Sequence, residues 1–258
     1  KLIDTGVTGI AYETVTSSDG SMPLLAPMST IAGQLAFVVG SYHLLKHNNG
    51  KGVMIGQMDN MDPRVVTVIG AGVSGTQSIL KAIDNNALVK VVDSSQSKLD
   101  ELKLQYGSNN VEYILSTKDS IQSSINDSDL VIGSVYVVGK EAPKVITKEM
   151  LSSMNPGTVM VDVSIDQGGC FETSKPTTHD NPTFLENEIV HYCVTNMPGA
   201  VPLTATEALN KVTLSYIEFI ANNGVSNALD SDEHLMNGLN IKDGIIIHPA
   251  VKEALSKL

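Results

Sequence analysis

A run of glycines after a short apolar stretch constrains the fold of this chain more than any other feature. Residues 65–69 ("VVTVI") are rich in β-branched side chains, and Gly70, Gly72 and Gly75 follow in a G-x-G-x-x-G spacing. The apolar stretch predicts a strand, and the residues from Ser74 onward predict a helix. The first glycine permits a tight turn, the second a close approach of backbone to ligand, and the third close packing of helix on strand. The pattern predicts a dinucleotide site, with the pyrophosphate on the N–H groups at the start of the helix.

The same alternation of short apolar runs and helical stretches continues along the chain. Five further runs read as strands, "LVKVVD", "VEYIL", "DLVIGSVYV", "GTVMVDVSI" and "EIVHYCVTNM", and residues 130–139 in particular as one buried strand. The runs are apolar on both faces, as is typical of parallel strands covered by helices. Six such strands predict an α/β fold with a doubly wound parallel sheet (Rossmann). We expect this domain to span residues 25–202, with residues 1–24 and 203–258 forming the remnant of a second, substrate domain.

Composition excludes several classes of partner. The formal net charge of -11 argues against nucleic acid, whose binding depends on clustered Lys and Arg. No apolar run approaches the roughly 20 residues that a membrane-spanning helix needs. The two cysteines, Cys170 and Cys193, have neither the spacing of a metal site nor that of a secreted disulfide framework. These features predict a cytoplasmic chain with no membrane partner and no metal.

Two aspartates are candidate site residues because each comes at the end of a predicted strand. Asp93 closes "VKVVD", where its carboxylate would accept hydrogen bonds from an adenosine ribose and repel a 2′-phosphate, favouring NAD over NADP. The alternative for Asp93 is a solvated cap of the next helix. Asp166 follows "VMVDVSI" and precedes Gly168 and Gly169, which makes it a candidate acid/base or orienting carboxylate near the nicotinamide. Its alternative is a strand-end aspartate that bonds the backbone of the turn.

Four segments, in this order, resemble the L-alanine dehydrogenase family. They are "ETVTSSDGSMPLLAPMSTIAG", "VIGAGVSGT", "VDVSIDQGGCFETSKPTTHDNPTF" and "HYCVTNMPGAVPLTATEALN". The resemblance covers essentially the whole chain. It implies a Rossmann domain and a substrate domain, assembly into hexamers, and conversion of L-alanine, water and NAD to pyruvate, ammonium and NADH.

The resemblance also assigns site residues. Asp166 matches the catalytic aspartate of the family. The positions that match cofactor contacts, together with the glycines and aspartate considered above, are Ser29, Gly70, Gly72, Val73, Ser74, Gly75, Asp93, Lys98, Ser116, Val135, Tyr136, Val163, Ser164, Ile165, Lys175, Val194, Thr195, Asn196 and Met197. For Lys98 the residues alone indicate only an exposed helix lysine.

The sequence departs from the family pattern in ways that limit the expected activity. The family's amino-terminal segment, with the Arg, Lys and His that act on the substrate, has no counterpart here, and we expect structural or solvated roles for the six histidines. The segments "STIAGQ", "GQMDNMDP" and "VPLTAT" also differ from the family. We therefore expect this chain to bind NAD but to turn over negligibly by itself. Two alternatives stay open: the NAD-binding domain of a proton-translocating transhydrogenase, and a non-catalytic NAD-binding or oligomer-forming subunit.

Overall fold

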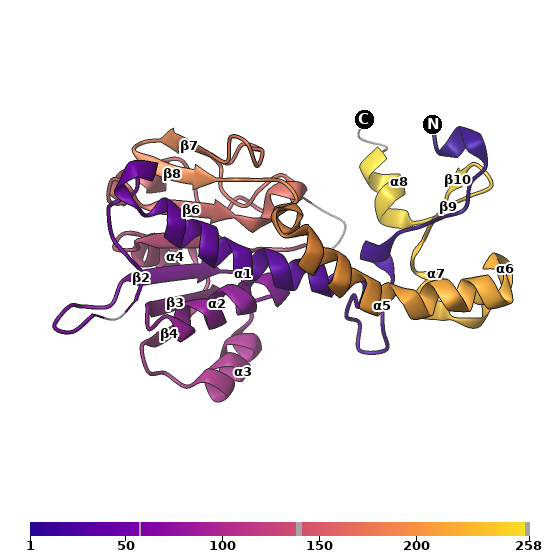
Figure 1. Ribbon diagram of the computed structural model, residues 1–258, viewed down its shortest axis with the longest axis horizontal. Coiled ribbons are helices and arrows are strands. Elements are labelled where there is room, and N and C mark those ends of the chain that lie inside the picture. Colours follow the sequence, from indigo (N-terminus) through magenta and orange to yellow (C-terminus); the bar gives the residue numbers. More distant parts are fainter. Residues whose placement is uncertain (57, 138–140, 256–258) are drawn as a thin grey trace. The chain divides into compact units, whose positions relative to one another are not determined.

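The computed structural model describes residues 1–56, 58–137 and 141–255 (Figure 1). The chain divides into two compact units. One contains residues 1–29 and the described part of residues 201–258, and the other contains residues 30–137 and 141–200. The predicted domain limits, 25–202 against 1–24 and 203–258, stay a prediction.

The larger unit is built on a seven-stranded sheet in the order β4-β3-β2-β5-β6-β8-β7. Six strands are parallel, as predicted: β2 (Val65–Ile69), β3 (Leu88–Asp93), β4 (Val111–Leu115), β5 (Leu130–Gly133), β6 (Val159–Asp162) and β8 (Ile189–Tyr192). The doubly wound α/β fold is therefore confirmed. The strand predicted over residues 130–139 is shorter than expected, since β5 ends at Gly133, and its predicted last residues, 138 and 139, lie outside the described part of the chain.

Strand alternation sends side chains into two separate cores, one on each face of the sheet. Val66, Val68, Val89 and Val91 pack in one core with apolar residues of α1 (Ala26–His43), α2 (Val73–Asp84) and α3 (Gln96–Tyr106). Ile69, Val92, Val131 and Met160 pack in the other with residues of α4 (Lys118–Ile125) and of the 3-10 helix η4 (Glu149–Ser153). Both faces are thus covered, which explains why the strands lack polar alternation.

The seventh strand, β7 (Thr183–Glu186), was not predicted and pairs antiparallel with β8 at one edge of the sheet. A two-residue turn joins them, and both of its residues have positive φ, Asn187 at 50° and Glu188 at 60°. Such a turn matches the natural twist of a hairpin. The segment predicted as one strand from Glu188 is therefore the second half of a hairpin.

The smaller unit has its own short sheet and core. Strands β1 (Gly9–Ile10), β9 (Leu239–Lys242) and β10 (Ile245–Ile246) pair antiparallel, and Val15, Leu24, Ala228, Leu229 and Leu235 form the core beside them. Its helices are α5 (Pro202–Asn223), α6 (Val225–Ser231), α7 (Glu233–Met236) and α8 (Pro249–Leu255), with the 3-10 helices η1 (Ile3–Thr5) and η2 (Tyr12–Thr14). Helix α5 begins five residues before the predicted Glu207, because Pro202 occupies its first turn, where no N–H is needed.

None of the described helices is long and apolar enough to cross a bilayer.

Candidate functional site

The glycine loop follows β2, at the point where the strand order reverses between β2 and β5. Gly70 has a φ of 93° and donates its N–H to the carbonyl of Val92 at 2.8 Å. A Cβ on Gly70 would lie 2.6 Å from the carbonyl oxygen of Ser134, and one on Gly75 would lie 1.8 Å from that of Gly70. Both positions therefore need glycine for the protein's own packing. In doubly wound sheets this reversal point is where ligands bind.

The middle glycine has a different environment. A Cβ on Gly72 would meet no protein atom within 4 Å, so packing within the chain does not explain a glycine there. Gly72 is also the N-cap of α2, which has no side-chain cap, whereas Ser95 caps α3 and Thr117 caps α4 with hydrogen bonds to the first-turn N–H groups. The start of α2 thus offers N–H groups and open space together, which is the arrangement that binds a phosphate.

Asp93, at the end of β3, lies directly beside this loop. Its Oδ2 accepts a hydrogen bond from the Ala71 N–H at 2.6 Å and its Oδ1 accepts one from the Ser95 N–H at 2.8 Å. It does not cap α3, because Ser95 does so. The next strand also ends here, since the Ser116 N–H donates to the Asp93 carbonyl at 2.9 Å. The structure therefore brings together the glycine loop, Asp93 and Ser116.

Asp166 lies on the 3-10 helix η5 (Val163–Gln167), which begins where β6 ends. Its side chain keeps access to solvent, yet partial burial raises the pKa of its carboxyl group, and a hydrogen bond from the Asn196 backbone N–H acts in the opposite direction. Asn196 follows β8 and has a φ of 54°. The segments that follow two neighbouring strands, β6 and β8, thus meet at Asp166. The carboxyl group of Asp166 keeps its proton to a higher pH than that of an ordinary aspartate.

The other predicted cofactor residues at these strand ends differ in how far they are exposed to solvent. Val135 accepts a hydrogen bond at its carbonyl from the Ser164 hydroxyl at 2.8 Å, which ties the end of β5 to η5. Val73 and Tyr136 are about half exposed, 51% and 46%, so both offer apolar surface beside the loop ends. Four members, Ile165, Val194, Met197 and Ser164, are mostly buried, and four keep solvent access, Ser74, Val163, Thr195 and Asn196.

Three further predicted residues make no described contact with the glycine loop or with Asp166. Lys175 lies 3.8 Å from Glu186, which pairs with Ile189, the first residue of β8, so its ammonium points toward the opposite end of the strand. Lys98 lies in the first turn of α3, where its N–H donates to Ser95 Oγ at 3.3 Å, and its ammonium forms an ion pair with Glu101 at 3.0 Å. Ser29 lies on α1 within the smaller unit. Their cofactor contacts stay predictions.

Sequence reasoning missed two polar residues that hold the site together. Ser134 donates its hydroxyl to the carbonyl of Gly70 at 2.7 Å, which fixes the glycine loop against the end of β5. Asp162, the last residue of β6, is fully buried and accepts N–H hydrogen bonds from Ser164 at 3.0 Å and Cys170 at 2.8 Å. Burial raises the pKa of Asp162. An aspartate inside an otherwise apolar strand was the available signal, because a buried carboxylate needs partners.

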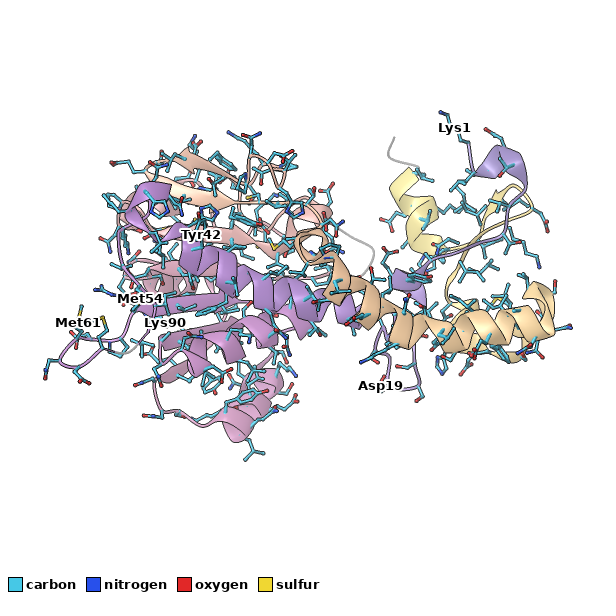
Figure 2. All side chains as sticks on the ribbon, in the orientation of Figure 1. Lys1, Asp19, Tyr42, Met54, Met61 and Lys90 are labelled. Atoms are coloured by element: carbon cyan, nitrogen blue, oxygen red, sulfur yellow. The ribbon has the colours of Figure 1, made fainter. Side chains whose placement is uncertain are left out.

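Two other features lie outside the site. Both cysteines are free and buried, and burial raises the pKa of both thiols, that of Cys193 to about 12, which disfavours the reactive thiolate form. A hollow lined by Met54, Met58 and Met61 lies in the loop before β2, at the amino end of the strand, and Figure 2 shows Met54 and Met61 on that loop.

Among the described residues, no group of three or more His, Cys, Asp or Glu side chains could hold a metal ion.

The family model "Alanine dehydrogenase/PNT, C-terminal domain" matches residues 36–249 of this chain. The chain belongs to this family. Among its curated relatives in the alanine dehydrogenase/PNT family, the alanine dehydrogenase of Halomonas elongata is 47% identical over 253 residues. That of Lysinibacillus sphaericus is 45% identical over 254 residues. In both cases the match covers 98% of this chain and 68% of the relative.

Two solved structures have a similar fold. An L-alanine dehydrogenase superposes with a TM-score of 0.93 at 41% identity, covering 99% of this chain and 70% of the other. A transhydrogenase from Sinorhizobium meliloti superposes with a TM-score of 0.79 at 21% identity, over 95% of this chain and 70% of the other. The second likeness is one of fold alone, so the transhydrogenase alternative is the weaker one.

Proposed function

We propose that this chain provides the NAD site and one catalytic carboxylate of an NAD-dependent alanine dehydrogenase. The reaction is the reversible conversion of L-alanine, water and NAD to pyruvate, ammonium and NADH. Membership of the family supports this proposal. The observation that carries it is the position of Asp166 on the same edge of the sheet as the uncapped start of α2.

The chain's own groups fit a dinucleotide at this edge. The first N–H groups of α2 would hold the pyrophosphate in the space in front of Gly72. Asp93 would accept hydrogen bonds from the adenosine ribose, and its negative charge disfavours the 2′-phosphate of NADP. The remaining proposed contacts are Ser29, Gly70, Val73, Ser74, Gly75, Lys98, Ser116, Val135, Tyr136, Val163, Ser164, Ile165, Lys175, Val194, Thr195, Asn196 and Met197.

Asp166 would handle protons near the reacting carbon. NAD, when bound, supplies the hydride acceptor. Deamination also needs protons moved at the amine and at the attacking water, and partial burial, which raises the pKa of the Asp166 carboxyl group, makes it a better proton acceptor than an ordinary aspartate. The Asn196 N–H holds the carboxylate in place after it has lost its proton.

Three wider features belong to the same proposal. We propose a homo-oligomer, a hexamer by resemblance, located in the cytoplasm and active in alanine catabolism. The nucleotide-binding domain covers residues 25–202 in this proposal. Light scattering of the purified protein tests the assembly, and a monomer at micromolar concentration would contradict it.

Cofactor choice is tested by titrating the 258-residue chain with NADH and NADPH and following nicotinamide fluorescence. We expect saturable NADH binding and at least about tenfold weaker NADPH binding, with the gap narrowed by Asp93→Asn. The exposed Asp100 on α3 offers a matched control, since Asp100→Asn removes the same charge without touching the loop. A chain that binds neither nucleotide contradicts the proposal.

The reaction is tested with NAD, L-alanine and this chain joined to the amino-terminal segment that the family pattern predicts. NADH should form only when alanine is present, and Asp166→Asn should slow its formation by roughly 10²–10⁴-fold, the usual contribution of a general acid or base. Full activity of the Asp166→Asn variant would remove Asp166 from the chemistry, while a silent parent enzyme would remove alanine as the substrate.

A further inference from the structure

The turn from Asp166 to Phe171 is held between two charged side chains of opposite sign, Asp162 and Lys144. We propose that both are positioning residues, which fix the backbone that carries Asp166 without touching cofactor or substrate. The inference rests on the proposed role of Asp166. It adds two residues to which neither the glycine motif nor the resemblance assigns a role.

The carboxylate of Asp162 gathers the N–H groups of the turn. Its Oδ2 accepts from Cys170 N–H at 2.8 Å and from Phe171 N–H at 3.3 Å, and the Ser174 hydroxyl also donates to it. Its Oδ1 accepts from the Ser164 N–H, the first turn of η5, at 3.0 Å. One fully buried side chain therefore connects the start of the Asp166 helix with the segment that follows the two glycines.

The ammonium of Lys144 gathers the carbonyl groups of the same turn. Its Nζ donates to the Gly169 carbonyl at 2.7 Å and to the Gly168 carbonyl. The carbonyls of two successive peptides thus face a positive charge while the following N–H groups face a negative one. Hydrogen bonds to charged groups are about twice as strong as those between neutral groups.

The backbone on either side of Lys144 completes this arrangement. The Ala142 N–H donates to the Gln167 carbonyl at 2.9 Å, and the Val145 N–H donates to the Cys170 carbonyl at 2.8 Å. The Gly168 and Gly169 N–H groups bond back to η5, to Ile165 and Ser164, both at 3.0 Å. Every N–H from residue 168 to 171 and every carbonyl from 167 to 170 therefore has a partner.

The fit leaves little room for movement. Gly168 and Gly169 both have positive φ, 85° and 78°, and a Cβ on Gly169 would lie 2.7 Å from Asp162 Oδ2. On the other side, a Cβ on Gly133 would lie 2.3 Å from Cys170 Sγ. A turn packed and bonded in this way keeps Asp166 at one position, which is what a proton-transfer group requires.

Binding of two ligands distinguishes the positioning role of Asp162 and Lys144 from the binding of cofactor phosphates at the glycine loop. ADP-ribose carries the phosphates and ribose but no nicotinamide, so it tests the glycine loop, whereas NADH tests the loop and the Asp166 corner together. We expect Asp162→Asn to leave ADP-ribose affinity unchanged and to lower NADH affinity by about tenfold, a typical cost for losing an outer supporting partner. Amide exchange at Cys170 and Phe171 should also accelerate at least tenfold, because an asparagine cannot accept from all of these donors.

A second pair of variants covers the case in which Asp162→Asn does not fold. Lys144 is exposed, so Lys144→Met should fold, lose NADH affinity in the same direction, and be rescued by Lys144→Arg. The matched control is Asp129→Asn, because Asp129 is a buried carboxylate that accepts from Lys51 and the Val65 N–H at the amino ends of the strands. It should lower stability without changing the ratio of NADH to ADP-ribose affinity.

The outcomes distinguish the two proposals. A parent chain that binds neither ADP-ribose nor NADH contradicts the cofactor site. A parent that binds both, with unchanged amide exchange and NADH affinity in Asp162→Asn and in Lys144→Met, overturns the positioning role alone. An equal loss in Asp129→Asn also overturns it, since the effect would then follow from general destabilisation.

Discussion

The two loops that meet the proposed cofactor are built in opposite ways. The glycine loop leaves the first N–H groups of α2 without a side-chain cap and leaves open space in front of Gly72. The turn after Asp166 has partners for each backbone group from the carbonyl of Gln167 to the N–H of Phe171. The first loop leaves N–H donors open to a ligand or to solvent, whereas the backbone groups of the second have partners within the chain.

This difference matches two chemical tasks. A phosphate is recognised by many weak donors, which backbone N–H groups at a helix start can supply with no charged side chain. A proton is moved by one group at one position, so its support has to be rigid before the ligand arrives. A substitution at Gly72, the open position of the first loop, should therefore affect binding, whereas Gly75 and the second loop are packed against the protein, so substitutions there should affect stability.

The largest effect on stability should come from Gly75→Ala. The new methyl group would lie 1.8 Å from the carbonyl oxygen of Gly70, and this backbone atom is fixed by the Ser134 hydroxyl. We expect a loss of about 3 kcal/mol in the free energy of unfolding, as in overpacked cores. Urea denaturation measures it, and an unchanged midpoint would show that the helix can shift away from the loop.

A smaller loss should follow from Gly169→Ala in the second loop. Here both a φ of 78° and a contact of 2.7 Å with Asp162 oppose the methyl group, and we expect about 2 kcal/mol. Gly168→Ala is the matched control, because it meets only Glu141 Cγ at 4.0 Å and suffers from its φ of 85° alone, at about 1 kcal/mol. Equal losses in the two variants would argue against close packing on Asp162.

Asp166→Asn should stabilise the fold slightly, and only above acidic pH. The folded state raises the pKa of Asp166, so the unfolded chain loses this proton first as pH rises past about 4. As the pH rises from the unfolded-state pKa through the folded-state pKa, the free energy of unfolding therefore falls, and it stays lower above the folded-state pKa. Below about pH 3 the carboxyl group is protonated in both states and this loss vanishes. We expect a gain under about 1 kcal/mol at neutral pH, since solvent screens the group. Thermal melts at pH 3 and pH 7 measure it, and a gain of equal size at pH 3 would exclude this cause.

The smallest effect on stability belongs to Gly72→Ala, although its effect on binding should be large. The methyl group meets no protein atom within 4 Å, so only the poorer N-cap counts, at about 0.5 kcal/mol. NADH affinity should fall at least about tenfold, because the methyl group fills the space proposed for the pyrophosphate. Isothermal titration measures it, and normal NADH affinity would break the contrast between the two loops.

Much of the sheet and the glycine loop could be predicted, because strand, turn and helix are encoded within a few neighbouring residues. Glycines at 70, 72 and 75 and an aspartate at 93 form a local pattern with known strand and helix context. The β7–β8 hairpin was missed because its turn uses Asn187 and Glu188, and the second position lacks the glycine that usually marks such a turn. The three-stranded sheet of the smaller unit was missed because residue 10 pairs with residue 239, far along the chain.

The supporting residues of the site could not be found in the same way. Lys144 reaches the carbonyls of Gly168 and Gly169, 24 and 25 positions away, and an exposed lysine carries no signal of such a contact. The apolar neighbours of Asp162 in the sequence indicate that its carboxylate is buried. They do not indicate its hydrogen-bond partners, such as the Cys170 N–H, because these come close only when the chain folds back on β6.

The hairpin at the sheet edge has a consequence for self-association. Strand β7 exposes one row of backbone groups that could template a strand from another molecule. It is four residues long, and its last residue, Glu186, lies 2.8 Å from Lys148 and 3.8 Å from Lys175, so an incoming strand would have to displace a charged cluster. A short strand with bound counter-charges of this kind opposes the addition of a strand from another molecule at β7.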